Sequence, residues 1–307
     1  MLHPVIVEIL TKKRKRMNKI QRGLPLDNFI WLYPHAVEKS LAYYTEKMAR
    51  KLLSPYLSYI RRNSSVKLDQ NYDDLEGYSR NYLLYLQSIN PEEEEEDKDL
   101  LLFFLTLYHF NRNELFRFMN RIIGMDFEGN TSWKEGQDKL FKATVQKEVL
   151  KNVIELIEKL KFVIVRDSIK GKTFNETWET FQKKTIDFYE KKLPLIARNV
   201  VGNTFAFITT NMMMVLGISE YFWITQNDER VRGNPEGRYK NSNPSHYIME
   251  GLLCRFDDPL VYSEDHGKSW IMKHGKMELK HYGQASNCRC TFKLNLKNEI
   301  KIIDKGL

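Results

Sequence analysis

The stretch VLKNVIELIEKLKFV, residues 149–163, decides the fold class of the first part of this chain. Its apolar residues recur at every third or fourth position and therefore lie along one face of an α-helix. The stripe consists of Val149, Val153, Leu156, Leu160 and Val163, with Leu150, Ile154 and Ile157 beside it. Because so wide an apolar face is unfavourable in water, a partner helix must cover it. The stretch predicts a helix inside a bundle.

The same spacing continues over residues 36 to 190, which we predict to be a helical region. An earlier stripe consists of Leu41, Tyr44, Met48 and Leu52. Pro55 is expected to bend or end that helix, because proline has no amide hydrogen to donate. Thr173 and Glu176 have the spacing of a capping box, in which each side chain bonds to the other's backbone N–H. Another helix is therefore expected to begin after Thr173.

After about residue 191 the sequence changes to short apolar pieces separated by Gly, Asn and Pro. Alternating apolar residues indicate half-buried strands, and the glycines between them indicate turns. The expected pieces are a helix over 193–216, a strand over 222–225, a loop over 233–244, a hairpin over 270–279 that turns at Gly275, and a strand in which Cys290, Phe292, Leu294 and Leu296 alternate. The predicted fold class is α+β, a predominantly α-helical N-terminal region followed by a small α+β domain at 191–307.

Composition places the chain among globular proteins. Hydrophobic residues make up 42% and charged residues 29%, which is enough apolar material for a core. The longest apolar run, residues 100–108, is far shorter than the roughly 20 residues of a membrane-spanning helix, so we expect no membrane association. The apolar start precedes the basic run instead of following it, so no secretory signal is expected. Three cysteines offer no disulfide framework, which favours a reducing cytosol.

Residues 1–35 are strongly basic and are expected to form an extended arm. They contain seven Lys or Arg against Glu8 and Asp27. The centre of the run is Lys12, Lys13, Arg14, Lys15 and Arg16. Two interpretations are open: a solvated terminus, or an arm that lies on DNA or on an acidic neighbouring subunit. The net charge of +8 coexists with 40 acidic residues, so it biases the protein toward polyanions without defining a site.

Four groups of polar and aromatic residues stand out in the C-terminal third. In chain order they are Arg198; Trp223, Thr225, Asp228, Arg230 and Arg232; His246 and Gly251; and Gly283, Asn287, Cys288, Arg289 and Cys290. Charged groups and an imidazole near the ends of short strands, with a tryptophan beside them, form either a buried ionic network or a catalytic cluster.

In this order the groups resemble the Mu F-like phage head morphogenesis family. The C-terminal domain of that family has an arginine, then W-x-T/A-x-x-D-x-R-x-R, then H-x-x-x-x-G, then P-G and N-C-R-C. The resemblance covers about residues 195–296, and residues 228–232 and 287–290 match outright. The chain departs from the pattern in two places. The segment between Arg232 and His246 is longer than in many members, and Tyr282 stands where proline is usual.

The resemblance implies a structural role in a tailed bacteriophage or prophage. Members of the family are minor head proteins that bind near the portal and are associated with head assembly, DNA packaging or DNA ejection. The implied partners are the phage portal protein, a capsid or scaffold protein and, without sequence specificity, DNA. The implied location is the virion, in the capsid interior or at the portal vertex, with assembly in the host cytoplasm. The resemblance implies action by contact, with no cofactor.

A zinc site is the first alternative for the cysteines. Cys288 and Cys290 with Cys254 and a choice of His246, His266, His274 or His281 provide enough ligands for a tetrahedral ion. However, a one-residue gap on an extended strand separates two Cα atoms by about 6.5 to 7 Å, and the usual two-residue spacing is missing. We therefore expect no metal, with both cysteines as small buried groups and Arg289 directed at Asp228.

A hydrolase site is the second alternative. Asp228, His246 and Arg232 could serve as general base, general acid and phosphate clamp of a metal-dependent nuclease or a toxin-like enzyme. Phosphodiester hydrolysis normally requires at least two carboxylates on a metal, and Asp228 and Glu229 are adjacent, so they face opposite ways. We therefore expect no enzyme, with Asp228 tying down Arg230 or Arg232 and Trp223 as a core anchor.

Overall fold

The chain forms two compact units, which we call the helical unit and the sheet unit. The computed structural model describes residues 30–63, 72–90, 98–123, 137–215 and 217–295. The helical unit comprises residues 35–105 and 134–200, and the sheet unit comprises residues 1–34, 106–133 and 201–307. The helices are α2 (His35–Arg62), α3 (Tyr72–Ser88), α4 (Lys98–Ile123), α5 (Gln137–Ile169), α6 (Phe174–Asp187) and α7 (Leu193–Val215). α4 and α7 have residues in both units.

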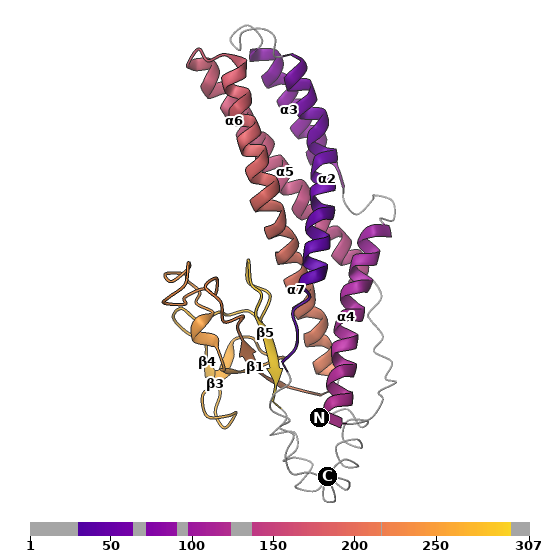
Figure 1. Cartoon of the computed structure of the whole chain (residues 1–307), viewed down its shortest axis with the longest axis vertical. Coiled ribbons are helices and arrows are strands. Elements are labelled where there is room, and N and C mark those ends of the chain that lie inside the picture. Colours follow the sequence, from indigo (N-terminus) through magenta and orange to yellow (C-terminus); the bar gives the residue numbers. More distant parts are fainter. Residues whose placement is uncertain (1–29, 64–71, 91–97, 124–136, 216, 296–307) are drawn as a thin grey trace, which may run out of the picture. The chain divides into compact units, whose positions relative to one another are not determined.

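The helical unit is a bundle built around α5. This helix packs against α2, α3 and α6, which run beside it in Figure 1. The apolar stripe of residues 149–163 is buried as the spacing predicts, with its five members between 0% and 5% exposed. Leu41 and Tyr44 are also buried, on α2. The prediction of a helix covered by partner helices is confirmed.

Of the two helix boundaries predicted from local sequence, the one at Thr173 is confirmed and the one at Pro55 is not. The capping box is present: the backbone N–H of Thr173 donates to Glu176 Oε2 at 2.8 Å, and α6 begins at Phe174. Pro55 does not end its helix, because α2 continues to Arg62. Pro55 lies on the exposed side of α2, where water can satisfy the carbonyl that the missing amide leaves without a partner.

The sheet unit contains one small antiparallel sheet. Its strands are β1 (Glu220–Ile224), β2 (Leu253–Arg255), β3 (Val261–Ser263), β4 (Ile271–Met272) and β5 (Thr291–Leu294), in the order β4-β3-β2-β1-β5. The central strand β1 pairs Tyr221 with Cys254 on β2 and Trp223 with Phe292 on β5. The predicted α+β class is confirmed, with helices first and the sheet toward the C-terminal end (Figure 1).

The hairpin predicted over residues 270–279 is wrong. The strand at its start, β4, pairs backward with β3, and residues 273–279 form no strand. Gly275 does have a left-handed backbone, with φ of 60°. The turn was correctly placed, and Lys273 before it and Glu278 after it are both buried although neither lies in a strand.

Aromatic rings form the core of the sheet unit. Tyr221, Phe256, Tyr282 and Phe292 are at most 1% exposed, and the rings of Tyr282 and Phe292 lie 4.6 Å apart between centroids. Trp31, at the end of the predicted arm, belongs to this core: it is fully buried and stacks on Phe292 at 5.1 Å. The sheet therefore contains a residue from near the start of the chain.

The N-terminal arm was predicted to be extended over residues 1–35. Its described part joins the sheet: Ile30 forms a bridge with Lys293, and the Trp31 N–H donates to Phe292 O at 3.0 Å. Lys12, Lys13, Arg14, Lys15 and Arg16 lie outside the described residues. No helix in the described part of the chain is long and apolar enough to span a membrane.

Candidate functional site

The central strand β1 carries the first motif residues into the sheet unit. Trp223 is fully buried, and its backbone is held by two hydrogen bonds: its N–H donates to Leu252 O at 2.9 Å and its O accepts from Gly251 N at 2.8 Å. The Thr225 N–H donates to Glu250 Oε2 at 2.6 Å. These bonds fix the point at which the chain leaves β1 and enters the segment of residues 225–232.

Asp228 is tied to the strand that ends the motif. Its Oδ2 accepts from Arg289 Nη2 at 2.8 Å, and its Oδ1 accepts from the Arg230 N–H at 2.9 Å. Burial works to raise the pKa of Asp228, but the hydrogen bonds from Arg289 and Arg230 outweigh it and hold that pKa below its usual value. The predicted pairing of Arg289 with Asp228 is present in the structure.

The loop of residues 233–245 begins and ends at the same place. The backbone oxygen of Arg232 accepts from the His246 N–H at 3.0 Å and from the Tyr247 N–H at 2.9 Å. The guanidinium of Arg232 donates to Ser286 O. The long segment between Arg232 and His246 therefore closes on itself, and the two motif residues meet although thirteen residues separate them.

His246, Cys288 and Cys290 form a buried cluster, which we call the thiol–imidazole cluster. His246 lies at the start of a short 3-10 helix, η3 (Tyr247–Met249), and the cysteines lie just before β5. His246 Nδ1 is 3.5 Å from Cys288 Sγ and 3.4 Å from Cys290 Sγ. The three residues are 3% to 4% exposed. They could hold a metal ion, since their three donor atoms lie within 4.8 Å of one another.

The two thiols meet because the chain turns before the strand starts. Asn287 has a left-handed backbone with φ of 59°, and the Cys290 N–H donates to Cys288 Sγ at 3.3 Å. Residues 288–290 belong to no strand, because β5 begins at Thr291, whereas the expected spacing was based on a strand. Cys254 lies apart from this cluster, on β2 opposite Tyr221, and burial raises the pKa of its thiol to about 11.

Two buried charged residues of the network were not found from the sequence. Glu278 Oε2 lies 3.2 Å from His246 Nε2, on the side of the ring that faces away from the thiols. Lys273 places its ammonium group 5.4 Å from the centre of the Trp223 ring. Burial lowers the pKa of Lys273 below its usual value, and the charges of Cys254 and Glu278 oppose this shift.

Without a metal, the cluster behaves as a coupled acid and base. Burial lowers the pKa of His246, but hydrogen bonds with Cys288 and Glu278 outweigh it and raise that pKa to about 9. Burial likewise raises the pKa of Cys288, and its bonds with Cys290 and His246 outweigh burial and lower it. The site thus favours a thiolate on Cys288.

The remaining motif residues have backbone roles or a different location. Gly251, Gly283 and Asn287 all have positive φ, of 74°, 76° and 59°, which explains why small or amide residues stand there. Arg198 belongs to the helical unit, where its Nε donates to Glu38 Oε1 at 2.8 Å.

His281 gives the sheet unit a predictable response to acid. Burial lowers its pKa to about 4, Lys273 lowers it further, and Asp258 and Asp257 oppose this; the Tyr221 hydroxyl lies 3.2 Å from its Nδ1. Because the unfolded chain binds the proton first, near pH 6.5, stability is lost as the pH falls from about 6.5 to 4, by roughly 1 kcal/mol per pH unit.

Replacement of His281 by glutamine is expected to flatten this dependence. Urea unfolding at a series of pH values measures it. The exposed His274 provides the matched control, His274→Gln, which should retain the wild-type slope. Equal slopes in wild type and His281→Gln would contradict the assignment.

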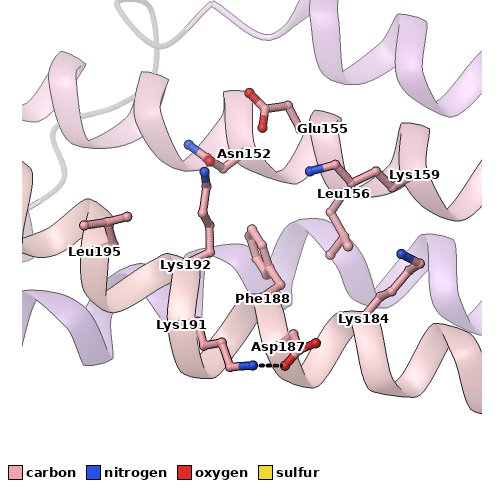
Figure 2. Close-up of a pocket in the computed structure, with 10 residues that line it drawn as sticks. All are labelled: Asn152, Glu155, Leu156, Lys159, Lys184, Asp187, Phe188, Lys191, Lys192 and Leu195. Atoms are coloured by element: carbon pink, nitrogen blue, oxygen red, sulfur yellow. Dashed lines mark hydrogen bonds and ion pairs between the residues drawn. The ribbon is translucent and has the colours of Figure 1, made fainter. Parts of the chain in front are cut away.

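A hollow lies in the helical unit, where a π-helical turn, η2 (Phe188–Lys192), joins α6 to α7. Figure 2 shows that its walls come from α5 on one side and from α6 and η2 on the other. Four lysines and two acids line it: Lys159, Lys184, Lys191, Lys192, Glu155 and Asp187. Lys191 forms an ion pair with Asp187, with 2.6 Å between Nζ and Oδ1. The excess of lysine attracts anions weakly and defines no specific ligand.

Comparisons of the chain with protein-family models, with curated proteins and with solved structures found no match. The resemblance to the Mu F-like family therefore depends on the motif residues alone.

Proposed function

We propose that this chain is a minor head protein of a tailed phage, which acts by contact at the portal end of the capsid in head assembly and in DNA packaging or ejection. The observation that carries the proposal is that the motif residues meet. Asp228 bonds to Arg289, sixty-one positions later, and His246 contacts Cys290, forty-four positions later. Contacts among these motif residues support the inference that the chain shares a domain with the Mu F-like family.

The chemistry of the network supports contact as the mode of action. Asp228 is occupied by Arg289 and Arg230, while Glu229 pairs with Arg238 at 2.6 Å. The two adjacent carboxylates therefore have separate partners and do not converge on a common ion, as a metal-dependent nuclease would require. His246 is 3% exposed, which leaves no access for a phosphodiester.

The helical unit supplies apolar side chains on which a partner could pack. Among its large apolar residues that are more than half exposed are several on α2, α3, α5 and the first part of α4: Tyr43, Leu84, Tyr85, Leu102, Leu140 and Phe162. A hollow between α2, α3 and α5 is lined in part by Tyr85. Large apolar side chains in water favour association, because burying them in an interface releases ordered water. We assign the portal ring, or the inner face of the capsid, as the partner of this unit.

Particles from a host that carries the gene test the proposal. Quantitative mass spectrometry of purified procapsids and virions is expected to find the protein in far fewer copies than the major capsid protein. Its absence from both would overturn the proposal. A portal gene immediately upstream is also expected.

A second test concerns the assigned surface. When the protein is co-expressed with the portal protein, the double change Leu84→Glu and Tyr85→Glu is expected to reduce co-purification at least tenfold, because it places charge at an apolar interface. Leu279→Glu, an equally exposed position on the sheet unit, is the matched control and should have no effect.

The rival function, a metal-dependent nuclease or toxin-like enzyme, is tested on plasmid DNA with magnesium or zinc. We expect no cleavage. Cleavage that His246→Ala abolishes would replace the contact mechanism by a catalytic one.

A further inference from the structure

The thiol–imidazole cluster has the spacing of zinc ligands. Zn–S bonds of about 2.3 Å and Zn–N bonds of about 2.0 to 2.1 Å at tetrahedral angles place sulfur and nitrogen about 3.6 Å apart. The observed distances from His246 Nδ1 are 3.5 Å to Cys288 Sγ and 3.4 Å to Cys290 Sγ. The distance from His246 Nδ1 to each sulfur is therefore already close to the distance that binding to one shared zinc ion would impose.

Hydrogen bonds can join the three atoms of this cluster only two at a time. Nδ1 of an imidazole has either one proton or one lone pair, so it can make one good hydrogen bond. Here both sulfurs approach the same nitrogen. A thiolate on Cys288 can pair with His246, and Cys290 then has no equivalent bond to that nitrogen. A cation between the three atoms would satisfy all of them together.

The surroundings orient the cluster as a metal site requires. On the far side of the ring, Glu278 Oε2 lies 3.2 Å from His246 Nε2. Glu278 is itself fixed, because its Oε1 accepts from the Lys280 N–H at 3.1 Å. A carboxylate in this position holds the proton on Nε2 and directs the Nδ1 lone pair toward the metal. The edge of the ring also packs on Trp223, with centroids 5.8 Å apart.

The backbone beside the cysteines fits bound thiolates. The Cys290 N–H donates to Cys288 Sγ at 3.3 Å, and such N–H groups stabilise negative charge on sulfur. Among the described residues, no fourth His, Cys, Asp or Glu joins the group. The last coordination position of a tetrahedral ion is therefore left to a water molecule. A site of two sulfurs and one nitrogen favours zinc among the common divalent metals.

We propose that His246, Cys288 and Cys290 bind one zinc ion with a structural role. The ion links the loop that ends at His246 to the entrance of β5, so its binding energy becomes folding energy for the sheet unit. The cluster is buried and the sheet is small, and a small core gains the most from such a link. The inference does not depend on the proposed head-protein function.

Metal analysis of the full-length protein tests the site. The chain is expressed without a histidine tag in zinc-supplemented medium, and all transition metals are measured by mass spectrometry. We expect one zinc per chain. Cys288→Ser and Cys290→Ser are expected to lose stoichiometric zinc. Cys254→Ser is the matched control, because it makes the same change at an equally buried cysteine outside the cluster, and it should retain the metal.

A graded variant separates zinc binding from folding. Glu278→Gln keeps the shape of the side chain and is expected to weaken zinc affinity by about 10- to 100-fold, as loss of an outer-shell partner does. If the cysteine variants fail to fold, X-ray absorption at the zinc edge of the wild-type protein decides: two sulfur neighbours and at least one nitrogen are expected.

Three results would overturn the proposal. The first is a wild-type protein that binds no zinc even when it is reconstituted with an excess. The second is zinc that is surrounded only by oxygen or nitrogen, and the third is a Cys254→Ser variant that loses as much zinc as Cys288→Ser does. Iron or copper in place of zinc would refute the identity of the ion.

Discussion

Gly202→Ala is expected to destabilise the protein by about 3 kcal/mol, although replacing glycine by alanine inside a helix normally stabilises the helix. Gly202 lies inside α7, where a Cβ atom would come within 2.5 Å of the backbone oxygen of Gly283. Gly283 cannot retreat easily, because it lies in a turn with a left-handed φ of 76°, and a Cβ atom added to Gly283 would itself come within 2.9 Å of Gly202 O. The helix and the turn touch backbone to backbone.

Gly77→Ala is the matched control for this prediction. Gly77 is also helical, on α3, and nothing lies within 4 Å of the position that its Cβ would take. The same substitution is therefore expected to stabilise the protein by about 0.5 to 1 kcal/mol. Urea unfolding gives both values, and hydrogen exchange in β1 and β5 locates the damage from Gly202→Ala. Changes of the same sign at both glycines would refute the close approach.

Trp31→Ala is expected to cost about 3 to 5 kcal/mol, the range for removing a fully buried aromatic side chain. Trp31 stacks on Phe292, its N–H donates to Phe292 O at 3.0 Å, and its O accepts from the Thr291 hydroxyl. The backbone of Trp31 therefore pairs with β5 on the edge that β1 does not use, and its indole covers the ring of Phe292. Its loss leaves a cavity beside the strand that follows the cysteines.

Leu32→Ala is the control for truncating a side chain in the same segment. Leu32 is the next residue and is 46% exposed, so its truncation is expected to change stability by less than about 1 kcal/mol. Thermal unfolding of both variants makes the comparison. A solvated arm, the alternative interpretation of the N-terminal segment, predicts small and equal effects, and that outcome would remove Trp31 from the core.

The helices were predictable because their signals are local. The stripe of residues 149–163 and the capping box of Thr173 depend only on residues three or four positions apart, and both are present. Pro55 was a weaker signal, because its effect depends on whether the carbonyl that it leaves without a partner can reach water. On the exposed side of α2 it can, and the helix continues.

The site was predictable in its members and not in its arrangement. The motif order identified Asp228, Arg289, His246 and both cysteines, and the structure brings Asp228 to Arg289. Glu278 and Lys273 carried no signal, since single charged residues in a loop-rich segment are usually solvated. The prediction of no metal placed Cys288 and Cys290 on an extended strand, but β5 begins only at Thr291.

The sequence alone determined the helical region, the small α+β domain after it and the residues of the motif, because periodicity and capping act within a few positions of the chain. Only the tertiary structure decided that Trp31 completes the sheet and that His246 meets Cys288 and Cys290. Those contacts join residues from 42 to 261 positions apart. Such contacts form only where the packing gain exceeds the entropy of closing the intervening chain, and no local pattern records that balance.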